Sequence, residues 1–352
     1  MHYREALPSM SDTYAYLNPL LSPADAEQML AIAEQLGRFG TYADEGTSEG
    51  LGESLPQRFD VGSNYVVRGL DGKGCTDEPA IALGRTNYFR ETYIYGDEQR
   101  VEGVESFAVH PSIGQSARSL MDSAVLVPAI VYANILVPGQ ELAIHTDVPE
   151  FRGLNRKNAP QWLLVCMLHS GLFDSWRVPI ATCVAWFGGN AGGAFTFYPD
   201  GAAGRRESIP ADHNTAIVLD TDRVFHGVER VKTVSLEETS AAGIADVGSG
   251  ASLYYQGGGQ WHLETSEGSG FDYGWADLRY SVSWKGYCFD SATSHQQWQA
   301  GEDSLTIAQV QHIFENDLGR RGIKKTNTLS PNDYAQLLVQ TYVSFPEGAA
   351  SI

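Results

Sequence analysis

The chain has 352 residues, which is enough for one large domain or two ordinary ones. It is 43% hydrophobic and carries 37 glycines, a composition typical of a globular protein with many turns. Its 43 acidic residues outnumber 24 basic ones, and the resulting net charge of -19 argues against a nucleic-acid backbone or an anionic membrane as partner.

No part of the sequence approaches the run of roughly 18 apolar residues that a membrane-spanning helix needs. The first residues have neither the basic start nor the apolar stretch of a signal peptide. The four cysteines form no CxxC motif, which favours a reducing compartment over a disulfide framework. We therefore expect a cytoplasmic protein.

The first clear element is a helix after Ser22, which is a natural N-cap followed by Pro23 at the first helical position. Apolar residues at helical spacing follow, and Gly37 suits the helix end. From Phe39 to Gly103 the chain is rich in glycine and mixed in polarity, which predicts loops with short strands.

A β-rich region follows, from about residue 124 to residue 290. Short runs of β-favouring residues recur there between Gly, Pro, Asn and Asp, which predicts an antiparallel barrel or jelly roll. No alternation of strands and helices appears, which argues against a doubly wound parallel sheet. The predicted strands are Val125–Val137, Leu142–Asp147, Trp162–His169, Ala181–Phe187, Ala194–Tyr198, Ala216–Leu219, Val224–Val231 and Arg279–Tyr287.

The end of the chain again has helical patterns, at 304–318 and after Ser330, whose Ser-Pro-x-Asp opening repeats that of the first helix. We expect one domain over residues 1–352. It comprises an N-terminal helical and mixed region (1–123), a β core (124–290) with an insertion (233–278), and C-terminal helices (291–352).

Three residues of the β region have the chemistry of a metal site. His145 and Asp147 lie two positions apart in a predicted strand, so both side chains point to the same face. His226, at the start of a later strand, is the best third ligand. Two histidines and one carboxylate on one face, with open positions opposite, form the facial triad of mononuclear non-heme Fe(II) oxygenases.

Four segments in this order resemble the Fe(II)/2-oxoglutarate-dependent dioxygenases, over roughly residues 130–286. Each has the pattern of a family motif: the first two ligands, a Gly-Gly-x-hydrophobic-x-Phe-Tyr-Pro hairpin, a Pro turn and strand before His-Gly-Val, and an Arg-x-Ser strand. They are Gly139-x-x-Leu142-x-x-His145-x-Asp147, Gly192–Pro199, Pro210–Val231 and Arg279-Tyr280-Ser281.

The resemblance implies a mainly β fold, a double-stranded β-helix (jelly-roll, cupin-like) core braced by helices at both ends. It implies Fe(II) held by the triad, with 2-oxoglutarate and O2 as cosubstrates, release of succinate and CO2, and support of activity by ascorbate. Arg279 and Ser281 would hold the distal carboxylate of 2-oxoglutarate. Guanidinium and hydroxyl groups are suitable donors to a carboxylate, and their spacing places both on one strand face.

The sequence departs from the family pattern in two places. Roughly fifty residues separate His226 from Arg279, and this Gly- and aromatic-rich insertion is interpreted as a lid near the iron or a disordered loop, with the lid favoured. Some members carry a tyrosine where this chain has Leu136. Tyr132 and Asn134 share its strand face, so one of them could take over contacts to the cosubstrate.

The carboxylate at position 147 argues against halogenation, because the halogenating relatives have Ala or Gly there. Hydroxylation, desaturation and ring closure all stay open. A small molecule is the expected substrate. A faint resemblance to members that oxidise free amino acids such as valine, including aziridine-forming ones, singles out Val343 and Phe345 as substrate contacts or, equally, as anchors of the last helix.

Two other functions also stay open. One is a cupin-like metal-dependent isomerase or hydrolase without 2-oxoglutarate, and the other is a barrel that only binds. The sequence does not indicate an oligomeric state.

Overall fold

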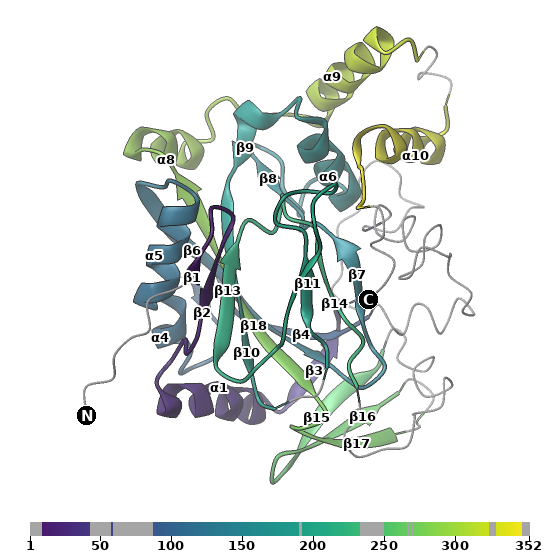
Figure 1. The fold of residues 1–352 in the computed structure, drawn as a ribbon. Coiled ribbons are helices and arrows are strands. Elements are labelled where there is room, and N and C mark those ends of the chain that lie inside the picture. Colours follow the sequence, from purple (N-terminus) through teal and green to yellow (C-terminus); the bar gives the residue numbers. More distant parts are fainter. Residues whose placement is uncertain are drawn as a thin grey trace.

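A computed structural model gives the fold (Figure 1) and describes residues 9–42, 58, 87–189, 192–232, 250–265, 268, 270–323 and 329–346. Its core consists of two antiparallel sheets. The small sheet has the order β12 (Glu207–Ile209), β11 (Phe195–Phe197), β14 (His226–Val228) and β7 (Leu142–His145).

The large sheet contains the remaining core strands and extends beyond them on both sides. Its order is β1 (Ser9–Met10), β2 (Tyr14–Leu17), β13 (Thr215–Leu219), β10 (Ile180–Phe187), β18 (Arg279–Phe289), β6 (Val125–Leu136), β4 (Phe89–Tyr95), β3 (Arg38–Thr41), β15 (Ser252–Gly257), β16 (Gln260–Glu264) and β17 (Gly270–Gly274). Off this path β5 (Glu98–Gln99) pairs with β4. β8 (Glu150–Phe151) and β9 (Arg177–Val178) form a separate two-stranded sheet.

The chain winds between the two sheets as a jelly roll. In sequence order β6, β10, β13 and β18 belong to the large sheet, whereas β7, β11, β12 and β14 belong to the small one. The inner faces pack together, because Trp186 of β10 and Phe195 of β11 have ring centroids 5.8 Å apart. This arrangement confirms the predicted double-stranded β-helix core.

Strand β18 separates the outer core from the interior of the barrel. Its residues Tyr280 and Trp284 face outward, donating hydrogen bonds to backbone oxygens of Met29 (3.1 Å) and Ala108 (2.8 Å). Because side chains alternate along a strand, the opposite face points between the sheets. That inner face carries Arg279, Ser281, Ser283 and Lys285.

Helices cover the large sheet and close one end of the molecule (Figure 1). Buried residues of α1 (Pro23–Leu36) and α5 (Pro111–Leu120) join the core cluster behind the large sheet, next to α4 (Glu105–Ala108). At the end opposite β15–β17 lie α6 (Gln161–Ser170), α9 (Ile307–Arg320) and α10 (Pro331–Tyr342), while α8 (Ala292–Gln299) follows β18. The predicted caps of α1 are confirmed: Ser22 accepts from the Asp25 amide, and Gly37 is left-handed at φ 74°.

The prediction of a strand at Trp162–His169 is wrong, since these residues form α6. Pro160 and the left-handed Gly171 bound the helix, and every residue from Gln161 to Leu168 is buried. A helix buried on all sides has no amphipathic period, so its apolar run cannot be distinguished from a buried strand by pattern alone.

The expectation of a lid or a disordered loop in the insertion is wrong for the described residues from 250 onward. They form β15, β16 and β17, which extend the large sheet from β3. Trp261 and Leu263 lie in the main core cluster, so this part is a structural layer. Residues 233–249 lie outside the described part. No helix among the described residues is both long and apolar enough to cross a membrane.

Candidate metal centre

Two buried histidines face each other across neighbouring strands of the small sheet. His145 ends β7, His226 begins β14, and the two are direct partners in the register. Their Nδ1 atoms lie 2.7 Å and 2.9 Å from the backbone oxygens of Ala143 and Val224. A carbonyl oxygen only accepts, so each Nδ1 carries the proton and each Nε2 presents its lone pair.

Asp147 completes the cluster from just beyond the end of β7, not from within the strand as predicted. Its backbone amide donates to the Thr221 oxygen at 2.9 Å, which fixes the turn. One carboxylate oxygen, Oδ1, lies 3.6 Å from Nε2 of His145 and 3.7 Å from Nε2 of His226. The structure therefore brings together the three ligands predicted from the sequence.

The geometry suits a divalent ion. Ligand bonds of about 2.1 Å at right angles put neighbouring donors about 3 Å apart, so a small contraction of the cluster would seat the metal. Two imidazoles and one carboxylate are the donor set of a non-heme Fe(II) site with open positions. The cluster of His145, Asp147 and His226 thus supports Fe(II) as the cofactor.

The electrostatics keep these groups in their metal-binding forms. Burial, followed by the neighbouring His145, lowers the pKa of His226 to about 3, so its imidazole is neutral at neutral pH. Burial alone would raise the pKa of Asp147. The ammonium of Lys285 and the two histidines outweigh that effect and hold this pKa well below its usual range.

Lys285 binds the other oxygen of the ligand carboxylate. Its Nζ lies 2.7 Å from Oδ2 of Asp147 and 3.4 Å from Oγ1 of Thr221. The two oxygens of Asp147 thus have separate partners, the histidines on one side and an ammonium on the other. The sequence offered a signal for this residue, because Lys285 continues the alternation of Arg279 and Ser281 along β18.

Arg279 and Ser281 lie inside the barrel, and each is 2% exposed. The Arg279 Nε donates to the Gly193 oxygen at 2.6 Å, and its Nη1 lies 3.4 Å from the Ser281 hydroxyl. Its Nη2 is buried and has no hydrogen-bond partner among the described residues. A buried guanidinium with an unused donor fits a ligand carboxylate, such as that of 2-oxoglutarate.

The two β6 residues considered as substitutes have different surroundings. Asn134 is the register partner of Ser281, and its buried Oδ1 lacks a hydrogen-bond partner in the described structure. Tyr132 lies one inward position further along, with the Arg90 guanidinium 4.0 Å from its ring centre. Asn134 therefore sits beside the predicted cosubstrate anchor, whereas Tyr132 lies on the wall of a cavity.

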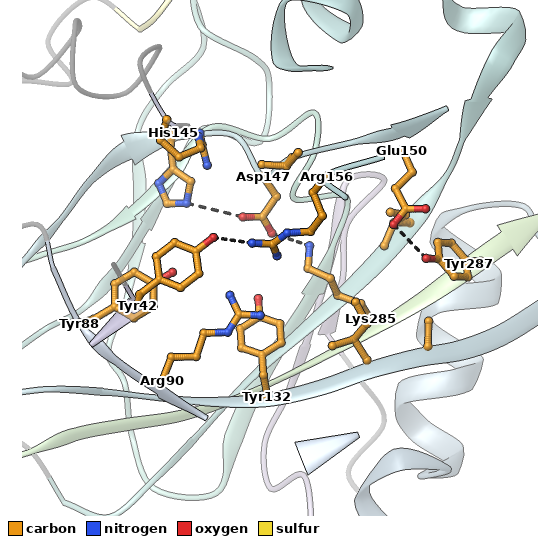
Figure 2. Close-up of a pocket in the computed structure, with 15 residues that line it drawn as sticks. Tyr42, Tyr88, Arg90, Tyr132, His145, Asp147, Glu150, Arg156, Lys285 and Tyr287 are labelled. Atoms are coloured by element: carbon orange, nitrogen blue, oxygen red, sulfur yellow. Dashed lines mark hydrogen bonds and ion pairs between the residues drawn. The ribbon is translucent and has the colours of Figure 1, made fainter. Parts of the chain in front are cut away.

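That cavity opens beside His145 and Asp147 (Figure 2). Its lining includes residues that the sequence analysis did not single out: Tyr42, Tyr88, Arg90, Glu150, Arg156, Lys285 and Tyr287. They lie in or next to β3, β4 and β18 and in the segment after Asp147, and apart from the alternation on β18 no local pattern marks them.

Val343 and Phe345 do not line this cavity. Both are 8% exposed and belong to the core cluster that packs α6, α9 and α10 together. The Phe345 ring lies 5.4 Å from that of Phe225, the residue before a metal ligand. They therefore hold the end of α10 against the barrel, and a role in substrate contact stays a prediction.

The chain matches no protein-family model and no curated protein sequence. It is similar to several solved structures. One is a prolyl hydroxylase from Trichoplax adhaerens in complex with a hypoxia-inducible-factor peptide (12% identity, 79% of this chain and 84% of that chain, TM-score 0.39).

Two further similar structures come from bacteria. A Pseudomonas putida prolyl-4-hydroxylase is 10% identical over 78% of this chain and 92% of its own, with a TM-score of 0.36. HygX from Streptomyces hygroscopicus, with nickel, 2-oxoglutarate and hygromycin B bound, is 9% identical over 78% and 83%, with a TM-score of 0.39.

Proposed function

We propose that this protein is an Fe(II)- and 2-oxoglutarate-dependent oxygenase that oxidises an unactivated C–H bond of a small molecule, a free amino acid or a natural-product intermediate. The observation that carries the proposal is the convergence of two imidazole Nε2 atoms and one carboxylate oxygen beside a cavity. A buried arginine with an unused donor, inside the same barrel, supports the choice of cosubstrate.

When bound, Fe(II) and 2-oxoglutarate supply an O2-dependent decarboxylation to succinate and CO2 that is coupled to oxidation of the substrate. The protein's own residues supply position. His145, Asp147 and His226 would hold the metal, and their Nδ1 and Oδ2 contacts fix the direction of each donor.

Arg279 and Ser281 would hold the distal carboxylate of the cosubstrate. Burial lowers the pKa of Arg279 to about 9, so the guanidinium stays charged at neutral pH. The Asn134 amide faces Ser281 across the strand pair and can contribute one more polar contact. The low exposure of Arg279 and Ser281, 2% each, would keep water from competing for the carboxylate.

The outcome of the reaction is proposed to be hydroxylation, desaturation or ring closure. Halogenation would need a coordination position free for a halide, where these enzymes lack the carboxylate ligand. In this chain Asp147 would take that position, and Lys285 holds its second oxygen. We expect one molecule of succinate to form for each molecule of substrate oxidised.

The test combines spectroscopy with product analysis. Anaerobic addition of 2-oxoglutarate to the Fe(II)-loaded protein should produce a weak visible charge-transfer band, and O2 should then convert 2-oxoglutarate to succinate. Both signals should vanish in His145→Ala, whereas Arg279→Gln should keep metal binding and weaken only 2-oxoglutarate. A metal-dependent isomerase or hydrolase would bind the metal without the band, and that result would refute the proposal.

A further inference from the structure

The chain leaves the small sheet between two of the metal ligands. Strand β7 ends at His145, so Thr146 and Asp147 lie beyond its ladder of hydrogen bonds. The backbone amide of Asp147 donates to the Thr221 oxygen at 2.9 Å. A ligand that lies outside a strand depends on such separate contacts for its position, so each of them bears on the geometry of the metal centre.

Thr146, which lies between these two ligands, is bonded to a histidine of α6. Its Oγ1 lies 3.1 Å from Nε2 of His169, and Thr146 is only 1% exposed. A hydroxyl both donates and accepts, so this hydrogen bond forms whichever ring nitrogen of His169 carries the proton. The backbone oxygen of Thr146 also accepts from Nη2 of Arg58 at 2.8 Å.

The same imidazole packs against the segment that carries the third ligand. The rings of His169 and Phe225 are stacked, with centroids 5.1 Å apart and an angle of 29° between their planes. Phe225 is 3% exposed and directly precedes His226 in the chain. One side chain of α6 therefore contacts the residue after the first ligand and the residue before the last one.

The helix that carries His169 is held by its own packing. Every residue of α6 from Gln161 to Leu168 is buried, and its apolar side chains share a core cluster with α9 and α10. Beyond α10, the Phe345 ring lies 5.4 Å from that of Phe225. The position of His169 is thus set by the helices at this end of the molecule, and a side chain on such an element can fix what it contacts.

We infer that His169 is a positioning residue of the metal centre. Its hydrogen bond to Thr146 and its ring stack on Phe225 hold the two ligand-bearing segments in place relative to each other. The inference rests on the metal centre of the proposed function, but not on the cosubstrate or the substrate. Loss of a partner that orients metal ligands lowers metal affinity by about 10- to 100-fold.

Mn(II) titration of the full-length protein measures this role, and urea unfolding of the metal-free protein measures any contribution to stability separately. His169→Phe keeps an aromatic ring and removes the hydrogen bond, so the Kd for Mn(II) should rise by about 10-fold or more. Thr146→Val removes the same bond from its other end and should have a similar effect. The double variant should lose no more affinity than the weaker-binding single variant, because both changes remove one bond.

A conservative variant and a matched control complete the test. His169→Gln places an amide nitrogen near the position of Nε2, so it should restore part of the affinity that His169→Phe loses. His295→Phe is the control, because His295 also stacks on an aromatic ring, that of Trp298 at 6.0 Å. It belongs to α8, which Figure 1 shows well away from β7, so its Kd for Mn(II) should equal that of the wild type.

The inference is wrong if His169→Phe and Thr146→Val both bind Mn(II) as the wild type does, because His169 would then support only the fold. It is also wrong if the two losses multiply in the double variant, or if His295→Phe loses as much affinity. Failure of the proposed function alone looks different: these comparisons would hold, but 2-oxoglutarate would give no charge-transfer band with Fe(II). A wild-type protein that binds no Mn(II) would refute the metal centre itself.

Discussion

At the scale of single residues, the orientation of Asp147 depends on a lysine from the opposite sheet. Oδ1 faces the two histidines, and Oδ2 accepts from Lys285. A carboxylate held in this way would offer the metal one oxygen. Other ligands could then take the remaining positions around the metal.

Replacement of this lysine should weaken the metal site. In Lys285→Met the second oxygen of Asp147 loses its partner and can rotate, so we expect metal affinity to fall by about 10- to 100-fold. Titration with Mn(II) measures the effect. Lys157→Met, which removes an exposed lysine, should bind as the wild type does. Equal affinity in Lys285→Met would show that the turn at Asp147 alone sets its orientation.

Asp222 makes stability depend on pH. Its side chain is fully buried, and neither carboxylate oxygen has a hydrogen-bond partner in the described structure. The Arg177 Nη2 lies 3.6 Å from Oδ2 of Asp222. The same nitrogen donates to both carboxylate oxygens of Asp220, at 2.7 and 2.8 Å. Burial raises the pKa of Asp222 to about 7. An unfolded Asp has a pKa of about 3.9, so the folded state holds the extra proton between these values. Stability contributed by this group is therefore lost as the pH rises from about 4 to 7.

Asp222→Asn removes the ionisable group and with it this loss of stability at higher pH. The variant should gain stability over the wild type at pH 8, on the order of a few kcal/mol, and much less at pH 5. Urea unfolding at both pH values measures the difference. Asp220→Asn should instead destabilise the protein at both, because it removes the well-bonded partner of Arg177. A pH-independent gain for Asp222→Asn would contradict the assigned pKa.

At the scale of elements, the hairpin before β11 and strand β18 meet at one glycine. Gly193 has φ +63°, and a Cβ placed there would lie 2.6 Å from Cδ of Arg279. Its backbone oxygen also accepts from the Arg279 Nε. The close approach of a backbone to the guanidinium stem explains why this position needs a glycine.

Gly193→Ala should therefore displace Arg279 without removing its charge. We expect weaker 2-oxoglutarate binding, by about tenfold or more, since misplacement costs a charge-assisted hydrogen bond. Gly201→Ala is a matched control, because Gly201 has φ +81° but nothing within 4 Å of its Cβ position. If Gly201→Ala weakens 2-oxoglutarate binding as much as Gly193→Ala does, backbone strain and not the contact with Arg279 explains the loss of affinity.

The sequence predicted the elements whose signals are local. The caps at Ser22 and Gly37, and the strands β6, β10 and β18, follow from capping chemistry and β propensity. α6 was missed because total burial removes the polar face that marks a helix. β15–β17 were missed because a strand that extends a sheet edge depends on its neighbour, here β3.

The site was predictable to the extent that its residues share a motif. His145 and Asp147 lie two apart, and His226 stands in a recognisable strand context, so the three could be joined. Arg90 and Arg156 come from separate elements, and only the folding of β4 against β6 places Arg90 beside Tyr132. Their convergence is a property of tertiary structure.

At the scale of the whole molecule, the metal site joins the two sheets. The histidines belong to the small sheet, while Lys285 reaches Asp147 from the large one. A metal that binds only the folded state should stabilise the protein. At a free concentration 100 times the Kd, the gain is about 2.7 kcal/mol. Mn(II) should raise Tm, and EDTA should reverse the rise. The Tm of His145→Ala should not change with Mn(II). An equal rise in that variant would indicate metal binding elsewhere.

The inner face of β18 also sets a length inside the barrel. Arg279 and Lys285 are six residues apart on one strand, which separates their Cα atoms by about 20 Å at the usual rise. Arg279 lies at one end of this stretch of β18, and Lys285 lies at the other end, where it contacts Asp147 of the metal site. Because the strand is hydrogen-bonded to β6 and β10 along its length, this spacing cannot adjust to a different cosubstrate. Oxaloacetate, one carbon shorter, and 2-oxoadipate, one carbon longer, should therefore not be decarboxylated by the enzyme in place of 2-oxoglutarate.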